Sequence, residues 1–174
     1  MFKKSLVRLA LAVGLFVPLL SQATTVSSGD ITITATVDQF AEWAAVTPIA
    51  AADFGGYITQ VNQTLTATKN LTLYANIAVT LAATTTVGNP DYSGILTSGT
   101  NTLNTAYSIT GAGITGSASL IPAASFFTAN TYSLPHTPGQ GAYTVTLTVT
   151  ASSPAASAPD AGNYSCGLAL TAGW

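Results

Sequence analysis

The chain has 174 residues, of which only 6% are charged, whereas a typical soluble domain carries about a quarter of its residues as Asp, Glu, Lys or Arg. Beyond residue 8 the only cation is Lys69, which stands against six acidic residues. Because nucleic acids and anionic lipids are bound mainly through clusters of basic residues, this balance argues against both as partners. A hydrophobic content of 48% also excludes a disordered chain. Such a surface suits an extracellular assembly, in which hydroxyl groups or neighbouring subunits cover the protein.

The N-terminal residues have the three parts of a secretory signal peptide. Three basic residues lie within the first eight positions, an apolar stretch extends over residues 9–20, and Ser21-Gln22-Ala23 supplies the small residues that a signal peptidase reads. The apolar stretch is short for a membrane span. We therefore expect residues 1–23 to be a signal peptide and residues 24–174 to be one secreted domain, located in the periplasm or at the cell surface.

Apolar residues alternate with threonine along much of the chain, which predicts β-strands. In residues 31–37 the alternation places Ile31, Ile33, Ala35 and Val37 on one face, and residues 143–149 repeat the pattern. Further strands are expected at residues 57–61, 63–68, 71–81, 103–110 and 164–170.

The predicted strands are separated by clusters of Gly, Pro, Asn and Ser, which favour turns. About seven short strands in one domain indicate an all-β sandwich or barrel. Residues 38–52 are expected to hold no more than a short helical turn. Residues 152–160 are expected to form a flexible link between the last two strands.

The C-terminal residues show two resemblances. Residues 160–166 resemble the tyrosine corner of an immunoglobulin domain, in which a tyrosine lies two residues before a cysteine, as Tyr164 does before Cys166. The whole ending, residues 160–174, resembles the spore coat protein U domain of archaic chaperone–usher pilins, whose last strand closes on an aromatic residue. The early Thr-rich strand, a Phe54-Gly55-Gly56 turn and the long strand at residues 71–81 follow in the order of that family. The cysteines that family members carry near the first strand and in mid-domain are absent.

The resemblance implies an immunoglobulin-like antiparallel β-sandwich that lacks its last strand. It further implies a structural subunit of a pilus, fibre or coat, assembled when a strand of one subunit completes the next. The implied partners are further copies of this chain or homologous subunits, together with a periplasmic chaperone and an usher. Ile31, Ile33, Ala35 and Val37 belong either to a donated strand or to the subunit's own first strand. The candidate terminal strand carries Tyr164, Cys166, Leu168 and Leu170 on one face.

No catalytic, cofactor-binding or metal-binding residues are predicted, and no small-molecule substrate. His136 is the only histidine, so no zinc site can be recognised, and no nucleophile motif accompanies it. Asp91 lies in the most calcium-like loop, but a single acid is far short of the six or more oxygens that calcium needs. Cys166, the only cysteine, is either a small buried residue or half of an intermolecular disulfide.

Two alternative functions remain open from the sequence. One is a monomeric carbohydrate- or surface-binding module with Trp43, Tyr57, Tyr92 and Tyr132 as candidate aromatic platforms. The other is a small outer-membrane β-barrel, to which the terminal Trp174 and the number of strands would be suited.

Overall fold

The computed structural model describes residues 34–84, 94–116, 119–129 and 131–174, in two units, Met1–Val37 and Asp38–Trp174. The predicted signal peptide, Ile31, Ile33 and Asp91 lie outside the described residues. The described part of the first unit, residues 34–37, is exposed and forms no strand, so the predicted strand at residues 31–37 is absent there. Within the described ranges no helix has the length and apolar character needed to cross a membrane.

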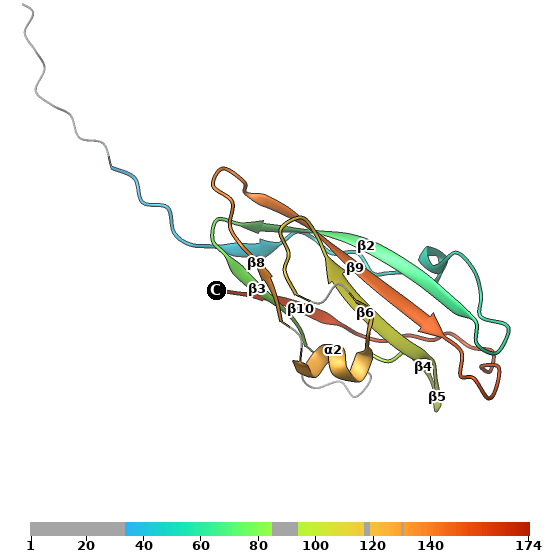
Figure 1. Ribbon diagram of the computed structural model, residues 1–174. Helices are drawn as coiled ribbons and strands as arrows, with labels where there is room; N and C mark the ends of the chain where they lie inside the picture. The colour runs from blue at the N-terminus through green and yellow to red at the C-terminus, as the bar shows by residue number, and fades with distance from the viewer. Residues whose placement is uncertain (1–33, 85–93, 117–118, 130) are drawn as a thin grey trace, which may run out of the picture. The chain divides into compact units, whose positions relative to one another are not determined.

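A five-stranded antiparallel sheet forms one layer of the second unit (Figure 1). In spatial order it consists of β1 (Ala41–Trp43), β2 (Thr64–Ala75), β9 (Ala142–Ser152), β6 (Asn104–Thr110) and β7 (Ile121–Pro122). Its centre is the pairing of β2 with β9, which runs from Thr64 opposite Ser152 to Tyr74 opposite Ala142. Because side chains alternate across a strand, the threonines of both strands face outward and the leucines and valines face the core.

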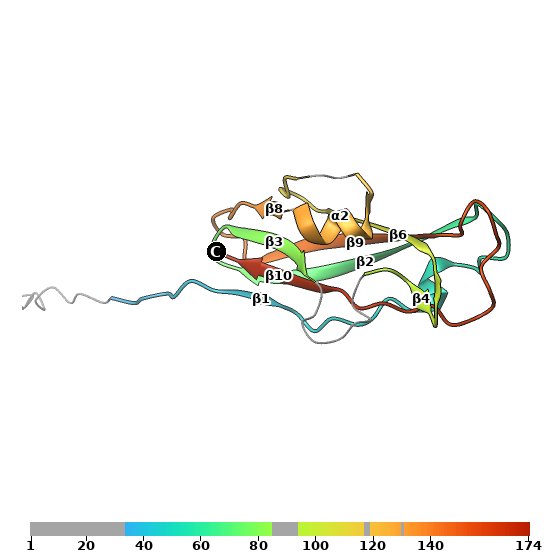
Figure 2. The same cartoon turned by 90° about the horizontal axis from the view of Figure 1, so that it is seen from below.

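A three-stranded antiparallel sheet forms the other layer, in the order β10 (Ala169–Gly173), β3 (Val79–Thr84) and β8 (Thr131–Leu134). Figure 2 shows this sheet in front of the five-stranded one, with helix α2 (Ala123–Ala129) beside it. Smaller elements are a 3-10 helix, η1 (Ala51–Phe54), and a ribbon of β4 (Thr97–Ser98) and β5 (Asn101–Thr102).

The hydrophobic core lies between the two sheets and is closed on one side by α2. Phe126 of α2 is fully buried, and its ring stacks on Tyr107 of β6 with centroids 5.1 Å apart. The ring of Tyr132, from β8, lies 6.2 Å from the same phenylalanine. Buried aromatic rings supply much of the stabilisation of a small core, since each removes a large apolar area from water.

The two antiparallel sheets form an all-β sandwich, so the predicted fold class is confirmed, and six of the strands follow the order of an immunoglobulin-like sandwich. In such domains strands A, B, E and D form one sheet and C, F and G the other. Here β1, β2, β9 and β6 stand in the places of A, B, E and D, and β3 and β10 stand in those of C and F. Within the described residues no strand pairs with the outer edge of β10, the place of strand G.

Several predicted strand limits are wrong. Residues 57–61 form a loop around the side chain of Gln63, whose amide accepts hydrogen bonds from the backbone N–H groups of Thr59 and Gln60 and donates to the carbonyl of Tyr57. A glutamine that replaces backbone partners in this way removes the need for a neighbouring strand. The predicted strands at 63–68 and 71–81 are instead one long strand, β2, followed by a turn and β3.

The turn between β2 and β3 is held by Asn76. Its side chain accepts a hydrogen bond from the N–H of Phe40 at 2.8 Å and donates to the carbonyl of Asp38 at 2.7 Å, while its own N–H donates to the carbonyl of Phe40. These hydrogen bonds tie the turn to residues that precede β1 in the chain. At this turn the chain leaves the first sheet and enters the second, a change of layer that the uninterrupted apolar pattern concealed.

Candidate assembly site

The side of the sandwich opposite α2 is bordered by two edge strands, β1 and β10. β1 pairs only with β2, and β10 pairs only with β3 within the described residues. The two strands lie side by side but do not form a ladder with one another (Figure 2). We call the core-packed apolar residues along these strands the β1–β10 seam: Ala41, Trp43, Leu168, Leu170 and Ala172.

The residues of the seam are only half-buried although they pack against the core. No residue of β10 is buried, whereas Val79, Leu81 and Ala83 on the neighbouring strand β3 are all buried. Both strands belong to the same three-stranded sheet and face the same core. β3 has a strand on each side, whereas β10 has a strand on one side only within the described residues. An edge of this kind exposes unpaired backbone groups as well as apolar area.

Trp43 is the largest residue of the seam. It lies opposite Leu73, whose side chain is fully buried, so the indole points to the inner side of the sheet. Its Nε1–H is shielded from solvent and has no hydrogen-bond acceptor among the described residues. A buried donor without an acceptor is unfavourable. The seam therefore combines uncovered apolar area with one unsatisfied polar group.

The approach to β10 is set by Tyr164 and Ser165. The Tyr164 hydroxyl donates to the carbonyl oxygen of Asp160 at 2.9 Å, which is the hydrogen bond of a tyrosine corner. Ser165 forms an isolated bridge with Thr97. The last strand therefore begins at Ala169 and not at Tyr164 as predicted. Of the four candidate terminal-strand residues, Leu168 and Leu170 contribute to the seam, whereas Tyr164 closes the corner.

Cys166 points to Tyr107 and is a free thiol. Its Sγ lies 3.2 Å from the Tyr107 hydroxyl, which itself donates to the carbonyl oxygen of Gly94. Burial raises the pKa of the Cys166 thiol, an effect that the hydrogen bond to Tyr107 partly offsets. Burial likewise raises the pKa of Tyr107, with a further rise from Cys166. A protonated thiol is a poor nucleophile, and in the described structure Cys166 lies within hydrogen-bond distance of Tyr107.

The candidate N-terminal residues within the described part, Ala35 and Val37, are both exposed, Val37 to 79%. The first strand of the second unit is β1, which begins at Ala41. The sequence did not single out Ala41, Trp43 or Ala172 for the site. β1 is only three residues long, and so short an alternation carries no recognisable signal.

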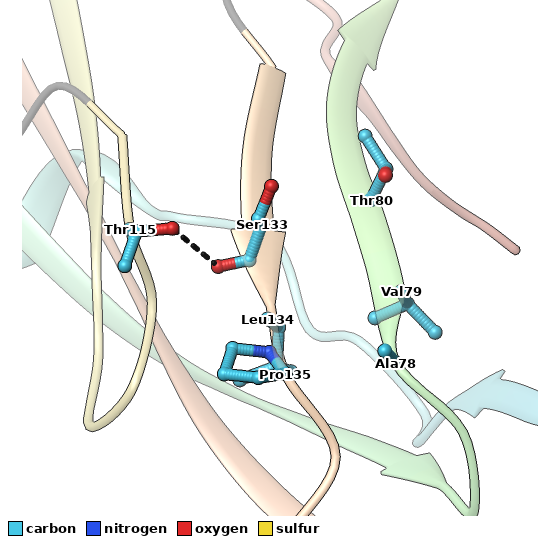
Figure 3. Close-up of a pocket in the computed structure, with 7 residues that line it drawn as sticks. All are labelled: Ala78, Val79, Thr80, Thr115, Ser133, Leu134 and Pro135. Atoms are coloured by element: carbon cyan, nitrogen blue, oxygen red, sulfur yellow. Dashed lines mark hydrogen bonds between the residues drawn. The ribbon is translucent and has the colours of Figure 1, made fainter.

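A depression of about 290 Å³ lies between the start of β3 and the end of β8 (Figure 3). It is lined by Ala78, Val79, Thr80, Thr115, Ser133, Leu134 and Pro135, none of which is charged. The Thr115 hydroxyl donates to the carbonyl oxygen of Ser133 at 3.4 Å. The polar side chains of the lining are the hydroxyls of Thr80, Thr115 and Ser133.

The side chain of His136 takes part in a group of hydrogen bonds within one loop. Its Nδ1 lies 2.9 Å from the Tyr143 hydroxyl, which also accepts a hydrogen bond from the N–H of Thr137 and donates to the carbonyl of Gln140. These contacts hold together the loop between β8 and β9. In the parts of the chain that the structure describes, no three His, Cys, Asp or Glu residues gather as a metal site would require.

The four aromatic residues considered as a carbohydrate platform do not form one surface. Tyr132 lies in the core with 1% of its surface exposed, Trp43 faces the inner side of β1, and Tyr92 lies outside the described residues. Tyr57 is exposed to 85%, alone at the loop around Gln63. Stacking on a sugar from one isolated ring provides little affinity or selectivity, and so these residues do not favour a carbohydrate site.

Comparison with known proteins gives no match to a family model, to a curated protein or to a solved structure.

Proposed function

We propose that the chain is a structural subunit of an extracellular fibre, pilus or coat, in which a strand from another copy completes the sandwich at the β1–β10 seam. The observation that carries this proposal is the outer edge of β10, which has no paired strand among the described residues, together with the half-burial of Leu168, Leu170 and Ala172. The proposal includes export through the predicted signal peptide, and a periplasmic chaperone and an usher as assembly partners.

Addition of a strand would both pair the free backbone groups of β10 and cover the apolar residues of the seam. An extended segment that pairs with β10 would satisfy its free backbone N–H and C=O groups, which is the source of affinity in β-augmentation. Alternate side chains of the same segment would cover the apolar residues of the seam. Covering apolar surface contributes about 25 cal/mol for each Å² removed from water. An added strand also brings hydrogen-bond acceptors close to the indole of Trp43, which has none among the described residues.

The segment that we propose as the donor is residues 31–37 of a second copy. Ile31, Ile33, Ala35 and Val37 share one face in an extended conformation, as an inserted strand requires. Ala35 and Val37 are exposed and belong to no strand. The outward residues of such a strand would be threonines, which suit a pleated, half-buried surface.

The proposal is tested with the exported chain and a synthetic peptide of residues 31–37. If the seam accepts this segment, the peptide raises the Tm of the protein by at least about 5 °C, because a ligand that binds only the folded state stabilises it. A control peptide contains the same residues in an order without alternation and leaves the Tm unchanged. Equal effects of the two peptides, or none from either, contradict the proposal.

Assembly itself is tested by negative-stain microscopy of the exported protein. Wild-type protein forms filaments or a regular coat, and a variant that lacks residues 24–37 remains monomeric. If the wild-type protein is a stable monomer at high concentration, assembly by strand exchange is contradicted.

A further inference from the structure

A short segment between β9 and the tyrosine corner has an unusual composition and conformation. Residues 154–159 read Pro-Ala-Ala-Ser-Ala-Pro and belong to no helix or strand, with bends at residues 155–157. Residues 155–158 are exposed, and Ser157 is the only one among them with a hydroxyl group. The prolines at both ends lack an N–H, so the segment is a poor partner for any neighbouring strand.

Both ends of this segment are fastened to the sandwich. On one side the Ser153 hydroxyl donates to the carbonyl of Gln60 at 2.7 Å and accepts from the N–H of Gln63 at 3.0 Å. On the other side the Asp160 carboxylate accepts a hydrogen bond from the Asn101 side chain at 3.0 Å. Ser157, between these points, has no hydrogen-bond partner among the described residues. The fold therefore presents one unpaired hydroxyl on a loop whose position is fixed.

We propose that Ser157 is an acceptor site for O-linked glycosylation after export. Serine-containing segments rich in proline and small residues suit this modification, because an enzyme can reach the hydroxyl and the backbone around it. The alanines on both sides of Ser157 leave its Oγ uncovered. The many threonines of β2 and β9 differ in this respect, since their backbone groups are paired within the sheet.

The reaction class follows from the proposed export, on which this inference rests. The co-reactant is a saccharide linked through its anomeric carbon to a polyprenyl pyrophosphate, and a membrane-bound transferase supplies the catalytic base. A bond forms between Ser157 Oγ and the anomeric carbon, and the bond between that carbon and the pyrophosphate oxygen breaks. The hydroxyl proton passes to the base of the transferase, and the polyprenyl pyrophosphate leaves with the bonding electron pair. No oxidation or reduction occurs.

The location of Ser157 is compatible with assembly and does not depend on it. Ser152, where β9 ends, pairs with Thr64 at the start of β2, whereas β1 pairs with the other end of β2 at Ala75. The length of β2 between these ends is about 35 Å. Figures 1 and 2 both show the loop after β9 at the end of the sandwich away from the label C. A saccharide there leaves the β1–β10 seam uncovered.

The test is mass spectrometry of the full chain isolated from its own organism. Cleavage before aspartate yields a fragment of residues 91–159, which contains Ser157, and a fragment of residues 160–174. We expect the first fragment to carry the added mass of a saccharide, and electron-transfer fragmentation to assign it to Ser157. The second fragment carries none.

Variants of the same chain give the matched controls. Ser157→Ala removes the added mass, Ser157→Thr retains it, and Ser133→Ala, which changes an exposed serine on β8, leaves it unaffected. Detection of an unmodified Ser157 in the wild-type chain, assignment of the saccharide to another residue, or its persistence in Ser157→Ala overturns the proposal. The mapping of the wild-type chain does not depend on any variant, and its result is separate from that of the assembly experiments.

Discussion

The hydroxyl of Tyr164 donates a hydrogen bond to the backbone carbonyl oxygen of Asp160, 2.9 Å away. This bond closes the corner through which the chain passes from β9 to β10. After this corner, Leu168, Leu170 and Ala172 pack against the core. A local contact between residues four positions apart thus lies directly before the proposed assembly surface.

The first prediction concerns this corner. Tyr164→Phe removes the hydrogen bond and is expected to lower the free energy of unfolding by about 1 kcal/mol, the usual net contribution of one such bond. Urea denaturation measures the change. Tyr57→Phe is the matched control, because Tyr57 is 85% exposed, and it is expected to leave stability unchanged. Equal losses in the two variants would argue against a stabilising corner.

The second prediction concerns the closure of the core by α2. Phe126→Ala leaves a cavity between Tyr107 and Tyr132 and is expected to lower the free energy of unfolding by about 3–5 kcal/mol. Phe40→Ala, at a side chain that is 42% exposed, is expected to cost less than about 1 kcal/mol. A small effect of Phe126→Ala would contradict the role of α2 as the cover of this side of the core.

The third prediction concerns the β1–β10 seam. Leu170→Asp places a charge where strand addition would bury it without a partner, which costs several kcal/mol. We therefore expect microscopy to show no filaments, although the half-buried position allows the monomer to fold. Thr171→Asp is the control, at the next position of β10, which is exposed. This variant loses one hydrogen bond to the Ala82 carbonyl but is still expected to assemble. Circular dichroism confirms that both monomers are folded. Assembly of Leu170→Asp with wild-type yield would place the contact elsewhere.

The fourth prediction concerns pH. Burial raises the pKa of Cys166 above its ordinary value of 9.0 and that of Tyr107 above its ordinary value of 10.0. In the folded state these groups keep protons that the unfolded chain releases as the pH rises past those values. The unfolded state then binds fewer protons, so the free energy of unfolding falls with increasing pH. We expect urea denaturation to show this decline beginning near pH 9.0, and lower pH to leave the contribution intact.

Cys166→Ala is the control for the pH experiment. Without the thiol the decline is expected to begin about one pH unit higher, where tyrosine titrates in the unfolded chain. A decline that begins at the same pH in both proteins would show that the thiol does not contribute.

The sequence predicted the central strands of the five-stranded sheet, but not the shorter elements beside them. The alternation at residues 143–149 and 103–110 identified β9 and β6, because a strand with one face in the core must repeat every second residue. β8 and α2 were missed. Both are short, and Phe126 stacks on Tyr107, which lies 19 positions earlier in the chain, so this contact leaves no local pattern.

The candidate site was predicted only in part. Leu168 and Leu170 were recognised from their alternation, whereas Trp43 was considered only as a surface aromatic residue. Its inward direction follows from its pairing with Leu73, thirty positions away along the chain. Pairing between distant segments is decided by register across the sheet, which a single sequence does not reveal.

By itself the sequence determined the class of the fold, because the period of its apolar residues is a local property of strands. It also determined the scarcity of charge and the tyrosine corner, whose bonded residues are only four positions apart. Only the tertiary structure decided which strands are edges, since an edge is defined by the absence of a neighbour in space. The corner at Tyr164 was therefore visible from the start, but the open side of β10 that follows it became apparent only when both sheets were in place.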